Sequence, residues 1–268
     1  MIDERAIAYF SMEIALHNGI PTYSGGLGIL AGDMLKSAAD LHVPMVAVTL
    51  LHEKGYFHQQ LDENGNQLEQ VVSWDPRKYL ELLPGIVNVE IEGRSVKIRA
   101  WKYELHGSRG FTIPVYFLDT NLDDNNPQDR SLTGQLYGGD ARYRLCQEII
   151  LGIGGIRMLR EVGHRAIKKY HMNEGHAGLA VLELLNEAHC QLNKPKTDPE
   201  TIEFVRRQCV FTTHTPVEAG HDRFAPDLVR NILGEHEIIR LNGFHEGRDF
   251  DITRLALNLS GYINGVSR

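Results

Sequence analysis

The chain has 268 residues, of which 42% are hydrophobic and 24% are charged. This composition predicts a globular protein with a core of ordinary size, in one large domain or two small ones, and it excludes wholesale disorder. The formal net charge of -7 predicts that nucleic acid and anionic membrane surfaces repel the protein, so neither is an expected partner.

The cysteines and the N-terminal residues predict a cytoplasmic location. Cys146, Cys190 and Cys209 are far apart and form no C-x-x-C pair, which predicts buried free thiols in a reducing compartment. The first residues are acidic and contain no apolar run of the kind found in signal peptides. The apolar run at 44–51 is too short to span a bilayer.

The first part of the chain predicts a strand, a glycine-rich loop, a helix and a second strand. Residues 6–13 form the expected first strand. Residues 29–41 carry apolar side chains at helical spacing. Residues 44–51 are a run of apolar and β-branched side chains, typical of a buried parallel strand. This order is a βαβ unit.

The middle of the chain predicts antiparallel strands. Residues 87–92 and 95–105 alternate in polarity on either side of a turn at Gly93, which indicates a hairpin, and residues 112–118 form another strand. We therefore expect an antiparallel β insertion at about 85–120.

The second half alternates helices and strands. Helical spacing covers residues 141–162, 176–189 and 200–207, and strands are expected at 166–171 and 209–213. Together with the βαβ unit, this alternation predicts an α/β fold with a doubly wound sheet.

Three polar segments follow expected strands, and ligands bind at that edge of open α/β sheets. The first is the loop Ser24-Gly25-Gly26-Leu27-Gly28, ahead of a helix. Its glycines allow close backbone approach, and a helix N-terminus offers free N–H groups to a phosphate or to sugar hydroxyls. The spacing fits neither a dinucleotide fingerprint nor a P-loop. A tight turn without a ligand remains an alternative.

The other two segments are Asn173-Glu174-Gly175-His176 and His214-Thr215-Pro216. Histidines that only make structural hydrogen bonds are one reading of them. A zinc site is another, which would use the histidines at positions 171, 176, 214 and 221. Their spacing matches no zinc motif, so we expect no metal. A carboxylate pair for glycoside hydrolysis stays open, because 35 Asp and Glu residues nominate no single pair.

Taken together, these segments resemble the α-glucan (glycogen, starch and maltodextrin) phosphorylases, especially their shorter bacterial and archaeal branch. The resemblance covers nearly the whole chain. Its blocks are residues 8–13, 23–38, 51–57, 136–140, 171–176, 211–224 and 264–268. The glycine block alone is moderately specific, whereas all the blocks in this order are highly specific.

The resemblance implies an enzyme that transfers glucosyl units from the non-reducing end of an α-1,4-glucan to phosphate, giving glucose 1-phosphate with retention. It implies a GT-B type glycosyltransferase of two Rossmann-like domains, of which residues 1–268 would be the N-terminal, glucan-binding one. In this family pyridoxal phosphate is bound to a lysine of the C-terminal domain, and its phosphate group relays a proton to the substrate phosphate.

The family's site residues fall on positions of this chain. Gly25 and Gly26 would line the phosphate side, with the N–H near Gly26 stabilising anionic oxygen, and Leu27 would touch the glucosyl ring. His214 would grip the sugar 6-hydroxyl, and its carbonyl would face the positive charge that develops at C1. Thr215 would support that histidine. The residues expected to line the channel beside the sugar are Glu13, Glu174 and His176.

The family also has parts that this sequence does not match. None of the lysines in this sequence stands in the context of the family's cofactor lysine. We therefore expect the C-terminal cofactor domain to be absent and the chain alone to be inactive. The resemblance leaves a homodimer open. Two alternatives are half of a nucleotide-sugar glucan synthase, whose family has a lysine where Ser24 stands here, and a non-catalytic glucan-binding module.

Overall fold

The computed structural model describes residues 5–70, 72–214, 222–237, 244–246 and 248–266. Among these residues an eight-stranded sheet has the order β13-β9-β8-β1-β2-β7-β6-β5. The strands are β1 (Ile7–Ser11), β2 (Met45–Leu50), β5 (Glu81–Ile91), β6 (Arg94–His106), β7 (Thr112–Asp119), β8 (Lys169–Asn173), β9 (Cys209–Thr213) and β13 (Tyr262–Gly265).

The sheet is mostly parallel, and its strand order reverses beside β1. Strands β13, β9, β8, β1, β2 and β7 run parallel to one another, while β6 is antiparallel to β7 and to β5. The chain adds β2 on one side of β1 and later adds β8 on the other side. The gap between β8 and β1 is therefore a topological switch point, where open α/β sheets bind ligands beyond the carboxyl ends of the strands.

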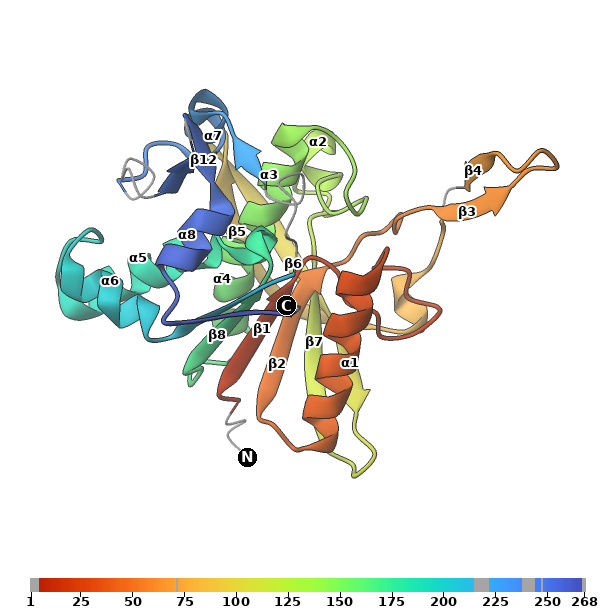
Figure 1. Cartoon of the computed structure of the whole chain (residues 1–268), viewed down its shortest axis with the longest axis horizontal. Coiled ribbons are helices and arrows are strands. Elements are labelled where there is room, and N and C mark those ends of the chain that lie inside the picture. The colour runs from red at the N-terminus through yellow and green to blue at the C-terminus, as the bar shows by residue number, and fades with distance from the viewer. Residues whose placement is uncertain (1–4, 71, 215–221, 238–243, 247, 267–268) are drawn as a thin grey trace.

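Helices cover both faces of this sheet (Figure 1). The helical segments are α1 (Gly26–Asp40), η1 (Pro76–Lys78), α2 (Pro127–Arg130), α3 (Ala141–Ile149), η2 (Ile150–Gly154), α4 (Gly155–Glu161), η3 (Gly175–Ala177), α5 (Ala180–Leu192), α6 (Pro199–Arg206), α7 (Pro226–Leu233) and α8 (Ile252–Asn258). A small sheet contains β10 (Arg223–Phe224), β12 (Asp249–Asp251) and β11 (His245–Glu246).

The core has two parts because alternate strand residues point to opposite faces. In β1, Phe10 packs into the larger cluster with η2, α4 and α5, while Tyr9 packs into the smaller cluster with α1. The doubly wound α/β fold that the sequence predicts is thus confirmed.

Helix α1 begins at Gly26, three residues earlier than the sequence predicts, so the glycine-rich loop forms its first turn. Gly25 is the N-cap and has an extended backbone. Further along, a Cβ at Gly32 would lie 2.0 Å from the Ala15 carbonyl oxygen. Only glycine therefore lets α1 approach the segment after β1 this closely.

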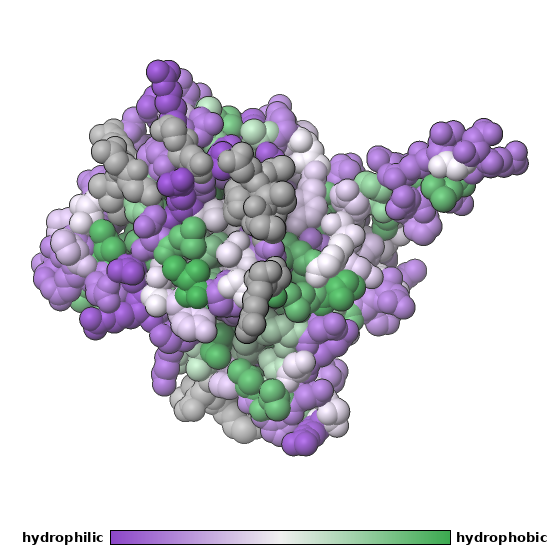
Figure 2. Space-filling view, viewed as in Figure 1, coloured by the Kyte–Doolittle hydropathy of each residue, from purple (hydrophilic) through white to green (hydrophobic). Residues whose placement is uncertain are grey.

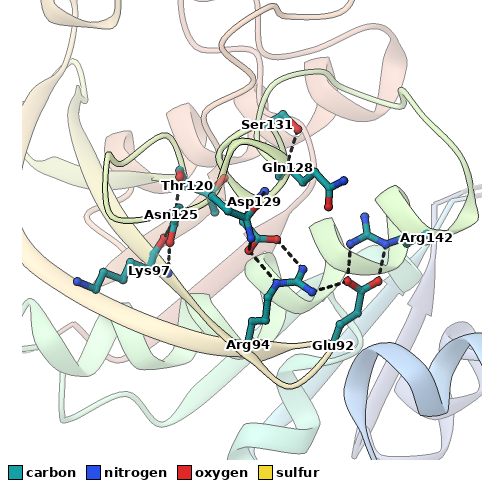
Figure 3. A network of polar contacts seen from close by, with 10 residues as sticks. Glu92, Arg94, Lys97, Thr120, Asn125, Gln128, Asp129, Ser131 and Arg142 are labelled. Atoms are coloured by element: carbon teal, nitrogen blue, oxygen red, sulfur yellow. Dashed lines mark hydrogen bonds and ion pairs between the residues drawn. The ribbon is translucent and has the colours of Figure 1, made fainter.

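The antiparallel strands expected at about 85–120 are present, and they extend the central sheet through β7. Glu92 and Gly93 form the β5–β6 turn, and both have positive φ, 54° and 70°. An ion-pair network fixes this turn to the body of the protein (Figure 3). Arg94 binds Asp129 and Glu92, and Arg142 also binds Glu92. Hydrogen bonds from Arg142 and Arg94 lower the pKa of Glu92 to about 2, although partial burial opposes this.

The helix predicted at 141–162 is continuous but contains the π-helical segment η2 at its centre. The segment lies against the sheet and against the start of α5. A Cβ at Gly152 would meet the Ala180 backbone nitrogen at 2.5 Å, and one at Gly155 would meet the Phe10 ring at 2.8 Å. These glycines allow the helical segment to pack closely against the start of α5 and against β1.

A hairpin of β3 (His58–Leu61) and β4 (Gln67–Gln70), which the sequence analysis did not predict, projects from the body of the protein (Figure 1). Its surface is mostly hydrophilic (Figure 2), although Leu61 and Leu68 are 65% and 48% exposed.

Two further sequence-based expectations concern burial and membrane spans. Cys146 and Cys209 are buried, as expected, but Cys190 is exposed near the end of α5, so that part of the prediction was wrong. No helix among the described residues is long and apolar enough to cross a membrane.

Candidate functional site

The carboxyl ends of β1, β8 and β9 lie side by side and carry most of the predicted site residues. Ser11 in β1 pairs with Asn173 in β8, which in turn pairs with Thr212 in β9. Glu13, Glu174 and His214 therefore leave the sheet at the same edge. This edge adjoins the switch point of the strand order.

Glu13 holds the glycine turn in place. Its carboxylate is 2% exposed. Oε2 accepts hydrogen bonds from the N–H groups of Ser24 at 2.7 Å and Gly25 at 3.4 Å. Oε1 accepts one from the hydroxyl of Tyr137 at 2.8 Å. The carboxylate therefore fixes the backbone just before α1.

The first turn of α1 faces open space. Its N-terminal N–H groups lack intrahelical partners by geometry, and no side chain among the described residues caps it. A Cβ built on Gly25 or Gly26 would meet nothing within 4 Å. Ser24, Gly25 and Gly26 are exposed, and Leu27 is half-buried. An anionic group can therefore approach these N–H groups, where the helix dipole favours negative charge.

A directional chain of hydrogen bonds runs from His214 to Glu13. His214 Nε2 lies 2.5 Å from Asn173 Oδ1, and Asn173 Nδ2 donates to the Ser11 hydroxyl at 3.1 Å. Ser11 in turn donates to the Glu13 carbonyl at 2.8 Å. The Ser11 hydroxyl donates its one proton to the Glu13 carbonyl, so it must accept a hydrogen bond from the Asn173 NH2 group. The Asn173 amide oxygen therefore faces His214.

This arrangement sets the protonation of His214. An amide oxygen only accepts, so Nε2 must carry the proton, and Nδ1 remains as a hydrogen-bond acceptor. Burial lowers the pKa of His214, although the negative charge of Glu174 partly opposes that shift. The imidazole is therefore neutral at pH 7, and its Nδ1 can accept a hydrogen bond from a hydroxyl group.

Glu174 follows β8, has a strained backbone, and reaches the end of β9 with its side chain. Its φ is 67° and its ψ is 168°, a region that costs a residue other than glycine on the order of 1–3 kcal/mol. Its side chain is 2% exposed, and its Oε1 accepts a hydrogen bond from the backbone N–H of His214. The strained residue thus positions the peptide that carries the histidine.

His176 lies in a second group beside the first. Its Nε2 is 3.4 Å from Asp222 Oδ2, and its ring centroid is 5.7 Å from that of Tyr137. Asp222 is also paired with Arg144 at 3.0 Å. Burial, and then the charge of Glu13, raise the pKa of Tyr137. Its phenol therefore stays protonated and joins His176 to Glu13.

The structure thus brings together Glu13, Gly25, Glu174, His176 and His214, with Gly26 and Leu27 in the adjoining helical turn. Thr215 and His221 lie outside the described residues. The sequence analysis gave no role to the connecting residues Ser11, Tyr137, Asn173 and Asp222, although all four stand inside blocks that carry the family resemblance.

His171, which belongs to the zinc alternative, forms a hydrogen bond between neighbouring strands of the sheet. Its Nε2 lies 2.7 Å from Thr212 Oγ1, which donates to Asn264 at 2.8 Å. Burial, followed by the charge of His214, lowers the pKa of His171 to about 4. Across the described parts of the chain, no three His, Cys, Asp or Glu side chains are grouped as metal ligands.

Comparison with known proteins gives a consistent result. The chain is 37% identical to the maltodextrin phosphorylase of Thermococcus litoralis, over 99% of this chain and 32% of that protein. It is 38% identical to the glycogen phosphorylase of Mycobacterium tuberculosis, over 97% of this chain and 33% of that protein. A glycogen phosphorylase of Aquifex aeolicus is 29% identical, over 99% of this chain and 40% of that protein. No family model matches the chain.

The chain spans about a third of the length of the first two relatives. The resemblance to α-glucan phosphorylases is confirmed as homology over nearly all of this chain. The mostly parallel sheet with helices on both faces fits one half of a GT-B glycosyltransferase.

Proposed function

We propose that this chain, a homologue of the α-glucan phosphorylases, supplies the glucan- and phosphate-binding edge of such an enzyme in the cytoplasm. The reaction transfers a glucosyl unit from an α-1,4-glucan to phosphate and yields glucose 1-phosphate. One observation carries the proposal. A neutral His214, held by Glu174 and Asn173, shares the switch-point edge with the open N-terminus of α1.

The N-terminus of α1 is suited to an anion. The N–H groups of Gly26 and Leu27 belong to the first turn, and the absence of a Cβ at Gly26 leaves room for oxygen to come close. Preorganised N–H donors of this kind stabilise negative charge that develops during reaction. Gly25 and Gly26 would therefore face the phosphate, with the apolar side chain of Leu27 against the sugar ring.

His214 is suited to a hydroxyl. Its Nδ1 would accept a hydrogen bond from the sugar 6-hydroxyl, since Nε2 donates to Asn173. Its backbone carbonyl would lie beside the anomeric carbon, where a carbonyl dipole stabilises positive charge. Glu174 would act by positioning this peptide, and Glu13 by positioning the glycine turn, while His176 lines the channel between them.

The described site residues fit the phosphate end of pyridoxal phosphate but not its covalent attachment. The glycine turn offers N–H groups to a phosphate, whereas no lysine is among the described site residues. When bound, the cofactor supplies a phosphate group for proton transfer to the substrate phosphate. The chain's own residues bind and orient the glucosyl unit. The attachment lysine and further phosphate ligands would come from a second domain that completes the enzyme, and a homodimer is compatible with this arrangement.

A fused enzyme tests the proposal. Residues 1–268 would replace the matching third of the Thermococcus litoralis maltodextrin phosphorylase. Chain 1–268 without the rest of that enzyme would be measured as the comparison. We expect the fused enzyme, and not the chain alone, to release glucose 1-phosphate from maltoheptaose and phosphate. Chain elongation that requires a nucleotide sugar would support a synthase instead. Retention of glucan without either reaction would support a binding module.

A further inference from the structure

His52 is a buried histidine outside the candidate functional site, just after β2. It is 0% exposed. Its φ of 45° lies in the left-handed region that residues other than glycine rarely adopt. Its carbonyl oxygen accepts hydrogen bonds from the Gly55 N–H at 2.7 Å and from the Trp74 indole at 3.2 Å. The backbone of His52 is therefore held in an unusual conformation, which fixes the direction of its ring.

The ring of His52 makes a single polar contact within the described part of the chain. Its Nε2 lies 2.9 Å from the Met12 carbonyl oxygen. Because a carbonyl only accepts, Nε2 carries the proton and Nδ1 is left as an acceptor. Nδ1 is buried, and no donor among the described residues reaches it. Burial lowers the pKa of His52 to about 4, although the bond to Met12 opposes that shift, so the imidazole is neutral at pH 7.

An unpartnered buried nitrogen and a left-handed backbone both cost free energy. Across the residues that the structure describes, the bond from Nε2 to the Met12 carbonyl is the one polar contact of the ring that offsets these costs. What this bond does for the molecule therefore decides what His52 does.

The Met12 carbonyl lies where the ladder between β1 and β2 has ended. The last backbone pair of that ladder is Phe10 with Val48. Beyond it, Thr49 Oγ1 donates to the Met12 carbonyl at 3.3 Å, beside the bond from His52. A carbonyl oxygen has two lone pairs, so these two side chains saturate it. Side chains at the end of β2 thus replace the backbone ladder and hold the chain after β1.

These bonds fix the backbone of Glu13 on one side, and Ser11 fixes it on the other. The Met12 carbonyl belongs to the planar peptide group before the Glu13 Cα. The Glu13 carbonyl belongs to the peptide group after it and accepts a hydrogen bond from the Ser11 hydroxyl at 2.8 Å. Because both peptide groups are held, the Glu13 side chain leaves the backbone in a fixed direction. Its carboxylate then accepts the N–H of Ser24 at 2.7 Å.

We propose that His52 is a positioning residue for the anion-binding end of the site. Acting through the Met12 carbonyl, it sets the direction of Glu13, and Glu13 holds the glycine turn ahead of α1. The hydrogen-bond chain from His214 also ends at Glu13, so His52 fixes the point at which both ends of the site meet. The role in phosphate binding rests on the proposed function. The effect on Glu13 rests on the hydrogen bonds alone.

The amide proton resonance of Ser24 measures the effect on Glu13 in chain 1–268, without any reaction. A hydrogen bond to a carboxylate moves an amide proton resonance downfield. Glu13→Ala removes the acceptor and gives the position of the unbonded amide. We expect His52→Leu to move the Ser24 resonance part of the way to that position. His52→Gln keeps an N–H donor and should leave the resonance near its wild-type position.

Thr49→Val gives an independent measurement of the same effect. It removes the second donor to the Met12 carbonyl with little change of shape. We expect the Ser24 resonance to move in the same direction as in His52→Leu but by less, because the bond from Thr49 is longer.

His164→Leu is the matched control. His164 is also a buried histidine, 5% exposed, and its Nε2 lies 2.8 Å from the Tyr116 hydroxyl. It precedes β8, at the amino end of the parallel strands, whereas the candidate functional site lies at their carboxyl end. Its replacement removes a comparable hydrogen bond and should leave the Ser24 resonance unmoved.

The fused enzyme tests the consequence for phosphate. His52→Leu should raise the phosphate concentration for half-maximal rate by roughly two- to tenfold, the contribution of one hydrogen bond. The maltoheptaose concentration for half-maximal rate should change little, because Glu13 acts on the glycine turn. His52→Gln should restore most of the wild-type phosphate dependence.

The role of His52 would be overturned by a Ser24 resonance that stays in place in both His52→Leu and Thr49→Val, or that moves equally in His164→Leu. It would also be overturned if the phosphate and maltoheptaose requirements rose together, or if His52→Gln were no better than His52→Leu, since the ring would then only fill space. A fused enzyme that releases no glucose 1-phosphate would instead contradict the proposed function and leave the Ser24 measurement valid.

Discussion

The backbone N–H of His214 is hydrogen-bonded to the carboxylate of Glu174, which lies 40 residues earlier in the chain. Glu174 holds a positive φ of 67°, and its buried side chain spans from the end of β8 to the end of β9. A strained residue at a strand end thus sets the position of a histidine on the neighbouring strand. Strain of this kind persists where the surrounding structure over-determines it, often at functional sites.

Replacement of Glu174 should therefore affect turnover more than glucan binding. In the fused enzyme, Glu174→Ala removes the acceptor that holds the His214 peptide, and we expect kcat to fall by on the order of 10²-fold with KM for glucan little changed. Glu174→Gln keeps an oxygen acceptor and should retain most of the activity. Equal effects of the two substitutions on kcat would show that the hydrogen bond to His214 does not matter.

Asn173→Asp tests the protonation of His214. A carboxylate beside Nε2 should raise the pKa of the imidazole by about 1–3 units and so add a proton at Nδ1 near neutral pH. Nδ1 would then no longer accept the sugar hydroxyl. We expect turnover of the fused variant to be low near pH 6 and to recover as the pH rises. Asn193→Asp, an exposed position after α5, is the control. An unshifted pH–rate profile in Asn173→Asp would contradict the tautomer assignment.

Gly26→Ala separates an anion site from a tight turn. The backbone of Gly26 is not in the left-handed region, and a Cβ there meets nothing, so the substitution should not strain the fold. Alanine in place of glycine should even stabilise α1 by up to about 1 kcal/mol. The methyl group would nonetheless intrude on an approaching anion. We expect a higher phosphate concentration for half-maximal rate in the fused enzyme and an unchanged or higher unfolding midpoint. A stabilised variant with normal phosphate dependence would favour a turn without a ligand.

Stability should fall as the pH drops below 6.5. Burial lowers the pKa of His52 and of His171 from 6.5 to about 4 in each case. Below pH 6.5 the unfolded chain therefore binds protons that the folded chain does not, and the free energy of unfolding decreases toward pH 4. Between about pH 7.5 and 5.5 each histidine should cost about 1 kcal/mol.

Urea unfolding of chain 1–268 at these two pH values measures this effect. His171→Gln keeps a donor for Thr212 but cannot be protonated, so its unfolding midpoint should depend less on pH than that of the wild type. His189→Gln, at an exposed position, should keep the wild-type dependence. The prediction fails if His171→Gln and His189→Gln respond to pH alike.

Much of the fold could be predicted because local patterns decided it. Strand β9 begins and ends where the sequence predicts, and β2 differs by one residue at each end, because both are short apolar runs between polar ones. The β3–β4 hairpin was missed because its strands are polar and exposed. The dipeptide Asn64-Gly65 in its turn was the available signal.

Other elements depend on contacts that no local pattern contains. Helix α1 begins at Gly26 although glycine is a poor helix former, because Glu13 holds the preceding backbone from 12 residues away. The π-helical segment η2 follows from close packing at Gly152 and Gly155. The same limit applies to the site. Ser11 and Asn173 are 162 residues apart, so their role in fixing His214 is visible only once β1 and β8 are paired.

The central claim is that His214 acts on the reacting sugar during phosphorolysis. The most direct test is the rate of glucose 1-phosphate release by the fused enzyme with His214→Ala, at saturating maltoheptaose and phosphate. We expect turnover to fall by on the order of 10²-fold or more, as when an oxyanion donor is removed, while binding of maltoheptaose changes little. A folded His214→Ala variant with near wild-type turnover would contradict the account.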